Sequence, residues 1–163
     1  MQAVGIICEY NPFHNGHVYH IQKTKELFPN SILILVLNGY FLERGEISIL
    51  SKSAKTNLAL QYGIDIVVEL PSVFGTQAAD IFAEKALEIL NHFEVSDVVF
   101  GSECNDISKL TFLAEKQSET KFTTKLQTLL KEGVNYPSAL SKALNVTEVI
   151  PPNDLLGISY AKA

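Results

Sequence analysis

The sequence predicts an α/β protein with a doubly wound parallel sheet and a helical C-terminal extension. Two observations carry this prediction. Short apolar runs, each stopped by turn-forming residues, alternate with helical patterns as far as Gly101. Only helical patterns follow that residue. Alternating strands and helices with short connections are typical of βαβ units, which build a parallel sheet.

The predicted strands are continuous apolar runs, not alternating ones. They span residues 3–8, 31–37, 64–70 and 97–100. Asn11-Pro12, Asn38-Gly39, Pro71 and Gly101 end them. Continuous runs of this length are typical of strands buried on both faces of a parallel sheet.

Helical spacing of apolar residues predicts helices between these strands, over residues 16–28, 51–62 and 76–93. In the second helix, Ala54, Leu58 and Leu60 are expected on or near the buried side. Residues 108–144 show further helical patterns, and 154–162 predict a last helix without a C-cap signal. We therefore expect a core over residues 1–104 and a helical extension packed on it over 105–163, in a protein that continues further.

Composition narrows the class of protein. Hydrophobic residues make up 47% and charged residues 19%, which is ordinary for a globular protein. The net charge of −5 disfavours nucleic-acid binding by this chain alone. Cys8 and Cys104 are expected to be thiols in a reducing compartment. Without a signal peptide or an apolar run of ~20 residues, we expect a cytoplasmic protein that does not enter a membrane.

The loop after the first strand carries the predicted chemistry. Ligands of an open parallel sheet bind beyond the carboxyl ends of its strands. There His14 and His17 lie three residues apart at the start of a helix, and Gly16 between them lets a ligand approach the backbone. A helix N-terminus suits phosphate, and two imidazoles can donate hydrogen bonds to oxygens that gain charge. We therefore predict a phosphate site in which His14 and His17 are catalytic.

Two plainer interpretations of these histidines stay open, helix capping and metal binding. His20 is the only further histidine nearby, and no cysteine pair accompanies it. A zinc site is therefore disfavoured, and no residue is predicted to ligate a metal.

These residues resemble a known family. His14-Asn15-Gly16-His17 matches the HIGH signature of nucleotidylyltransferases and class I aminoacyl-tRNA synthetases, which have a Rossmann-like fold. Residues 5–17 look like the opening of the bacterial tRNA(Met) cytidine acetate ligases, and residues 38–46, 65–71, 100–103 and 152–160 match later motifs of that family in order.

The resemblance implies a ligase that activates acetate with ATP as acetyl-adenylate and releases pyrophosphate. It then acetylates N4 of the wobble cytidine of elongator tRNA(Met) without coenzyme A. Magnesium is expected with the ATP. The full-length protein, with a tRNA-binding region beyond residue 163, is expected to bind the tRNA. No sequence feature fixes an oligomeric state.

The same resemblance implies which residues bind ATP. Gly101 would leave bare backbone for the adenosine, and Asn153 would hydrogen-bond the nucleotide. The implied set is Ile7, Cys8, Glu9, Tyr10, Asn11, Pro12, Phe13, His14, Asn15, Gly16, His17, Val18, Tyr19, His20, Gly101 and Asn153.

Other charged residues allow two interpretations each. Arg44 and Lys52 either bind phosphate or tRNA or are solvated, and Glu69 and Glu103 are either near the site or structural. Ser51-Lys52-Ser53 is not taken as a KMSKS-type loop, because such loops follow later strands. An arginine that helps bind ATP in the family would lie beyond residue 163, so this chain alone is expected to bind ATP weakly.

Two rival functions remain. A small-molecule nucleotidylyltransferase, acting on pantetheine phosphate or nicotinamide mononucleotide, shares the histidines. Its first loop usually reads Gly-x-Phe-Asp-Pro-x-His, from which Glu9 and Asn11 depart. A catalytically inactive nucleotide-binding module is the other.

Overall fold

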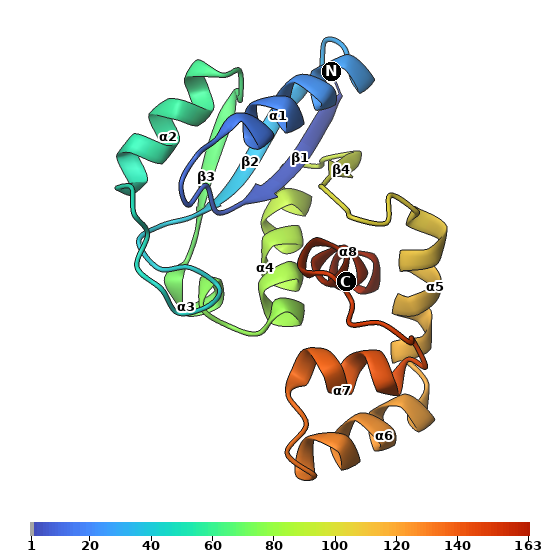
Figure 1. The fold of residues 1–163 in the computed structure, drawn as a ribbon. Coiled ribbons are helices and arrows are strands. Elements are labelled where there is room, and N and C mark those ends of the chain that lie inside the picture. The colour runs from blue at the N-terminus through green and yellow to red at the C-terminus, as the bar shows by residue number, and fades with distance from the viewer. Residues whose placement is uncertain (1) are drawn as a thin grey trace. The chain divides into compact units, whose positions relative to one another are not determined.

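The predicted strands form one parallel sheet in the first of two units of the molecule (Figure 1). The computed structural model describes residues 2–163, and the first unit ends at Phe100. Within the described residues the strands are β1 (Ala3–Cys8), β2 (Ile32–Asn38), β3 (Ile66–Leu70) and β4 (Asp97–Val99). Their order is β3-β2-β1-β4, all parallel. This confirms the predicted α/β class.

The order of the strands creates a topological switch point. The chain runs from β1 outward through β2 to β3 and then returns to the other side of β1 as β4. Connections therefore diverge between β1 and β4, which is where open α/β sheets bind ligands. The register aligns the strand ends, because Leu37 pairs with both Cys8 of β1 and Glu69 of β3.

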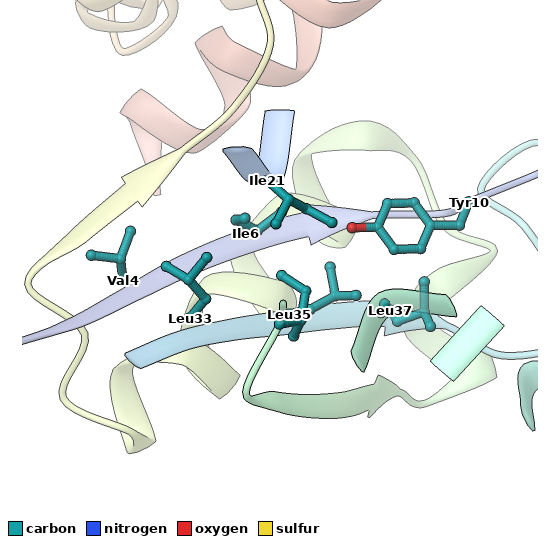
Figure 2. Packing of buried hydrophobic residues seen from close by; sticks show 9 residues of the cluster. Val4, Ile6, Tyr10, Ile21, Leu33, Leu35 and Leu37 are labelled. Carbon is teal, nitrogen blue, oxygen red and sulfur yellow. The ribbon is translucent and has the colours of Figure 1, made fainter. Parts of the chain in front are cut away.

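Helices α1 (Asn15–Leu27) and α2 (Lys52–Gln61) cover one face of this sheet. Their Ile21 and Ala59 pack among alternate strand residues, several of which Figure 2 shows. This core cluster consists of Val4, Ile6, Tyr10, Ile21, Leu33, Leu35, Leu37, Ala59 and Ile64.

Helix α4 (Ala79–His92) packs against the sheet through the other set of strand residues. A Cβ added to Gly5 of β1 would lie only 2.6 Å from Leu90 Cδ1, so this glycine allows the close approach of helix and strand. The short α3 (Ser72–Gly75) precedes α4. The helix predicted over residues 76–93 therefore started too early, because α4 begins only at Ala79.

Two further expectations were wrong. The strands were expected to be buried on both faces, and β2 is indeed buried from Leu33 to Asn38. Strand β3, however, is bonded to β2 alone among the described strands, and its Ile66 and Glu69 are exposed. In α2, Leu60 is 45% exposed, and Lys55 and Ala59 occupy the buried side instead. Leu60 follows Ala59 by one position, which turns its side chain about 100° away around the helix.

The second unit, Gly101–Ala163, is helical as predicted. It contains α5 (Ile107–Gln117), α6 (Thr120–Lys131), α7 (Tyr136–Ala143) and α8 (Pro152–Lys162). Helix α5 packs against α8, and α6 packs against α7. Asp106 and Asn135 cap the first turns of α5 and α7 with their side chains. No helix in residues 2–163 is long and apolar enough to cross a membrane.

Candidate functional site

The loop between β1 and α1 places His14 and His17 side by side. His14 is the N-cap of α1, and its Nδ1 accepts a hydrogen bond from the Gly16 N–H at 3.0 Å. In return, His17 Nδ1 accepts from the His14 N–H at 3.3 Å. The two rings stack with centroids 3.9 Å apart. Two histidines thus form a reciprocal capping box, a role that Ser or Thr and Glu fill in other helices.

Gly16 is required by the ring of His14. A Cβ at this position would lie 2.8 Å from His14 Cε1 and 3.0 Å from Nδ1. A side chain there would displace the ring from its cap. The absence of a side chain at Gly16, expected to let a ligand approach the backbone, is thus also needed for the ring of His14.

The capping box fixes which ring nitrogens can donate. A neutral imidazole has one donor and one acceptor nitrogen, and in both rings Nδ1 is the acceptor. The protons are therefore assigned to Nε2. Within residues 2–163, neither Nε2 has a hydrogen-bond partner, so two N–H donors are available at the N-terminus of α1.

Burial beside aromatic neighbours keeps His17 neutral. Its ring lies 4.6 Å from Tyr10 and 5.6 Å from Phe13 between centroids. Burial lowers the pKa of His17 to about 4, and electrostatic repulsion from His14 and His20 adds smaller contributions in the same direction. At pH 7 the ring is therefore uncharged and acts as a hydrogen-bond donor, not as a cation.

Three other residues of the predicted nucleotide-binding set, Ile7, Cys8 and Tyr10, support this site from within the protein. Tyr10 is 1% exposed and has a φ of 50°, so its ring points into the core. Burial raises the pKa of the Cys8 thiol to about 12, which keeps it protonated. Ile7 is also buried. The side chains of Ile7 and Tyr10 are therefore taken up by packing in the protein interior.

Other members of the predicted set hold neighbouring segments. The Asn11 Oδ1 accepts from the Ile49 N–H at 2.8 Å. The His20 ring, whose pKa is lowered by burial, hydrogen-bonds the Val99 carbonyl through Nε2 at 3.2 Å, which ties α1 to the end of β4. Phe13 and Val18 are half-buried, and the remaining three are exposed: Pro12, Asn15 and Tyr19.

Sequence reasoning missed Lys55, whose side chain is fully buried. Its Nζ donates to the carbonyls of Asn38 at 2.7 Å, Gly39 at 2.8 Å and Glu9 at 3.1 Å. Burial lowers the pKa of Lys55, and Glu9 and Glu69 oppose that shift. A lysine four residues before Ala59 is the signal that could have revealed a cation on the buried side of α2.

Glu9 joins the first loop to the second. Its Oε1 accepts from Asn38 Nδ2 and from the Glu43 N–H, each at 2.7 Å. Asn38 also donates to the Gly75 carbonyl at 3.3 Å. Together with Lys55, this network holds the ends of β1 and β2 at one edge of the sheet.

Gly101 and Asn153 lie in the second unit, so their membership of the nucleotide site stays a prediction. A Cβ on Gly101 would meet no atom within 4 Å. The Asn153 Nδ2 donates to Glu103 Oε1 at 2.9 Å. Glu103 also accepts from the Asp154 N–H, and Asp154 in turn accepts from the Glu103 and Cys104 N–H groups. Glu103 is thus engaged in capping α8, and residues 2–163 contain no cluster of three potential metal ligands.

Known proteins share this arrangement. The sequence pattern of the HIGH nucleotidyl transferases matches residues 1–163. The chain belongs to that family. Among curated relatives, the tRNA(Met) cytidine acetate ligase of Fusobacterium nucleatum is 46% identical over 161 residues, covering 99% of this chain and 40% of the relative. The enzyme of the same name from Mesomycoplasma hyopneumoniae is 42% identical over 98% of this chain and 52% of its own length.

A solved structure agrees with this HIGH family assignment. Thermotoga maritima TmcAL bound with alpha-thio ATP superposes with a TM-score of 0.87 at 38% identity, covering 99% of this chain and 43% of that one. The resemblance to tRNA(Met) cytidine acetate ligases is thereby confirmed. The chain spans about 40 to 52% of the length of the relatives named above.

Proposed function

We propose that the protein carrying this chain activates acetate with ATP and acetylates N4 of the wobble cytidine of elongator tRNA(Met). The similarity to ligases of that name supports the reaction. A relative with an ATP analogue bound supports ATP as the nucleotide. The protein would act in the cytoplasm on its tRNA.

One observation in the first unit carries the proposal. The reciprocal cap of His14 and His17 leaves two Nε2–H donors at the N-terminus of α1, after the central strand beside the switch point. Donors held in this way need no reorganisation when charge develops on phosphate oxygens. Residues of this kind fit the triphosphate of ATP, because the helix N-terminus also favours negative charge.

The chemistry of the first step requires no protein nucleophile. An acetate oxygen attacks the α-phosphorus, and pyrophosphate leaves with the electron pair of the broken P–O bond. His14 and His17 hold the phosphates in line and donate hydrogen bonds to their oxygens. Magnesium, when bound with ATP, neutralises phosphate charge.

Further parts of the proposal rest on family resemblance. Residues 7–20, Gly101 and Asn153 would surround the nucleotide, with residues 1–104 as the ATP-binding core and 105–163 as its helical extension. The net charge of −5 leaves the tRNA backbone to be bound by basic surface elsewhere in the full-length protein.

Acetate-dependent exchange of labelled pyrophosphate into ATP tests the first step. The full-length protein should catalyse this exchange, and His17→Ala should reduce it by at least about 100-fold, as the loss of a transition-state donor does. His92→Ala is the matched control. His92 lies on α4, with its ring against the Glu88 carbonyl, so exchange should persist.

Two results would contradict the proposal. Exchange that ignores acetate but requires a phosphorylated vitamin derivative would indicate a small-molecule nucleotidylyltransferase. Nucleotide binding without any exchange in the full-length protein would indicate an inactive binding module.

A further inference from the structure

A pocket lies beside the candidate ATP site, at the C-terminal ends of β2 and β3. Its volume is about 370 Å³, which reaches the roughly 300 Å³ at which small-molecule sites begin. The first two turns of α2 contribute Lys52, Thr56 and Asn57, and β3 contributes Glu69. None of these groups has a part in the proposed activation of acetate.

The Glu69 carboxylate is held in place within this pocket. Lys52 Nζ donates to its Oε2 at 2.9 Å. A Cβ on Gly39 would overlap Glu69 Oε1, so the absence of a side chain at Gly39 gives the carboxylate its position against the end of β2. Both partners of the ion pair are about half exposed, and Oε1 remains able to accept from a ligand.

The charges of the pocket favour a neutral ligand over an anion. Lys52 and Glu69 compensate one another, so an acetate or phosphate ion would meet the Glu69 carboxylate as well as the lysine. Thr56 and Asn57 add hydroxyl and amide groups, which can both donate and accept. A carboxylate acceptor beside several donors matches a heterocycle that carries an amino group and ring acceptors.

The strand register places this pocket near the reacting groups. Cys8, Leu37 and Glu69 lie in one row across β1, β2 and β3. At about 4.8 Å per strand, Glu69 is about 10 Å from the end of β1, where the histidine loop begins. Tyr40, 48% exposed and 5.5 Å from Lys52 Nζ, offers a ring for stacking beside the pocket.

We propose that this pocket holds the cytosine ring of the acceptor nucleoside, with Glu69 accepting a hydrogen bond from its N4 amino group. Lys52 and Asn57 then face the N3 and O2 acceptors of the base. This assignment rests on the proposed function, in which cytidine N4 must reach the activated acetate.

The assignment gives Glu69 a role in the second step. N4 attacks the acetyl carbon and forms the N–C bond. The bond between that carbon and the phosphate oxygen breaks, and AMP leaves with its electron pair. The N4 proton passes to the Glu69 carboxylate. The products are N4-acetylcytidine and AMP, with the proton on the protein.

The test compares two rates in the same preparations of full-length protein. One is acetate-dependent pyrophosphate exchange, and the other is transfer of labelled acetate to a tRNA(Met) transcript. In Glu69→Gln the ratio of transfer to exchange should fall about 100-fold, within the range of general-base contributions. Gly39→Ala keeps the carboxylate but displaces it, so the same ratio should fall there too.

Glu88→Gln is the matched control, because Glu88 forms an exposed ion pair with Lys85 on α4, at 2.6 Å. Its ratio should equal that of the wild type. An unchanged ratio in Glu69→Gln, including one in which both rates fall together, would overturn the cytosine assignment. Absence of acetate-dependent exchange in the wild type would instead refute the proposed function on which it rests.

Discussion

At Gly16, the space that a side chain would need is already taken by the ring of His14. The two histidines cap the helix through Nδ1, and this arrangement directs both Nε2 protons to solvent or ligand. The position of the His14 ring, and with it the direction of its Nε2 proton, therefore depends on the absence of a side chain at Gly16. Alanine is the smallest substitution that tests it.

Gly16→Ala should separate stability from nucleotide binding. Alanine gains up to about 1 kcal/mol over glycine in a helix, so urea unfolding should show little or no loss of stability. The displaced His14 ring loses hydrogen bonds to phosphate, each worth about 1.5–3 kcal/mol with a charged partner. The KM for ATP in the exchange assay should therefore rise about 10- to 100-fold. An unchanged KM would mean that the position of the His14 ring is unimportant.

At the scale of elements, one buried cation on α2 binds the ends of β1 and β2, in addition to the packing of Ala59 on the sheet. Lys55 donates to the carbonyls of Glu9, Asn38 and Gly39, which lie at or just after the ends of β1 and β2. The same helix carries Lys52, which is exposed and paired with Glu69. The helix thus offers two lysines, three positions apart, with opposite environments.

Lys55→Met should lower the free energy of unfolding by about 3 kcal/mol, because two buried carbonyls and one partly buried carbonyl lose their donor. Lys52→Met should lower the free energy of unfolding far less, because an exposed ion pair contributes little to stability. Urea denaturation of both variants provides the comparison. Equal losses in the two would show that the buried contacts of Lys55 contribute nothing beyond an exposed pair.

At the scale of the whole molecule, the features that could be predicted from the sequence are those that a short stretch of residues determines. Four apolar runs indicated the strands, and the spacing of His14 and His17 indicated that they face one way. The strand order and the exposed edge at β3 depend on contacts between distant segments, so no local pattern revealed them. The mutual capping of Glu103 and Asp154 joins residues 51 positions apart and was missed for the same reason. The prediction for Leu60 was wrong because this residue directly follows the buried Ala59, so its side chain points away from the buried side of α2.

The proposed function depends on His14 and His17 donating hydrogen bonds from Nε2 to the phosphates of ATP. Nitrogen-15 NMR of histidine-labelled protein, titrated from pH 8 to pH 4 with and without ATP and magnesium, tests it most directly. The predicted result is that His17 carries its proton on Nε2, stays neutral until the pH falls to about 4, and shifts its Nε2 resonance when ATP binds. A proton on Nδ1 of His17 at pH 7, or Nε2 resonances that do not shift with saturating ATP, would contradict this assignment of the donors.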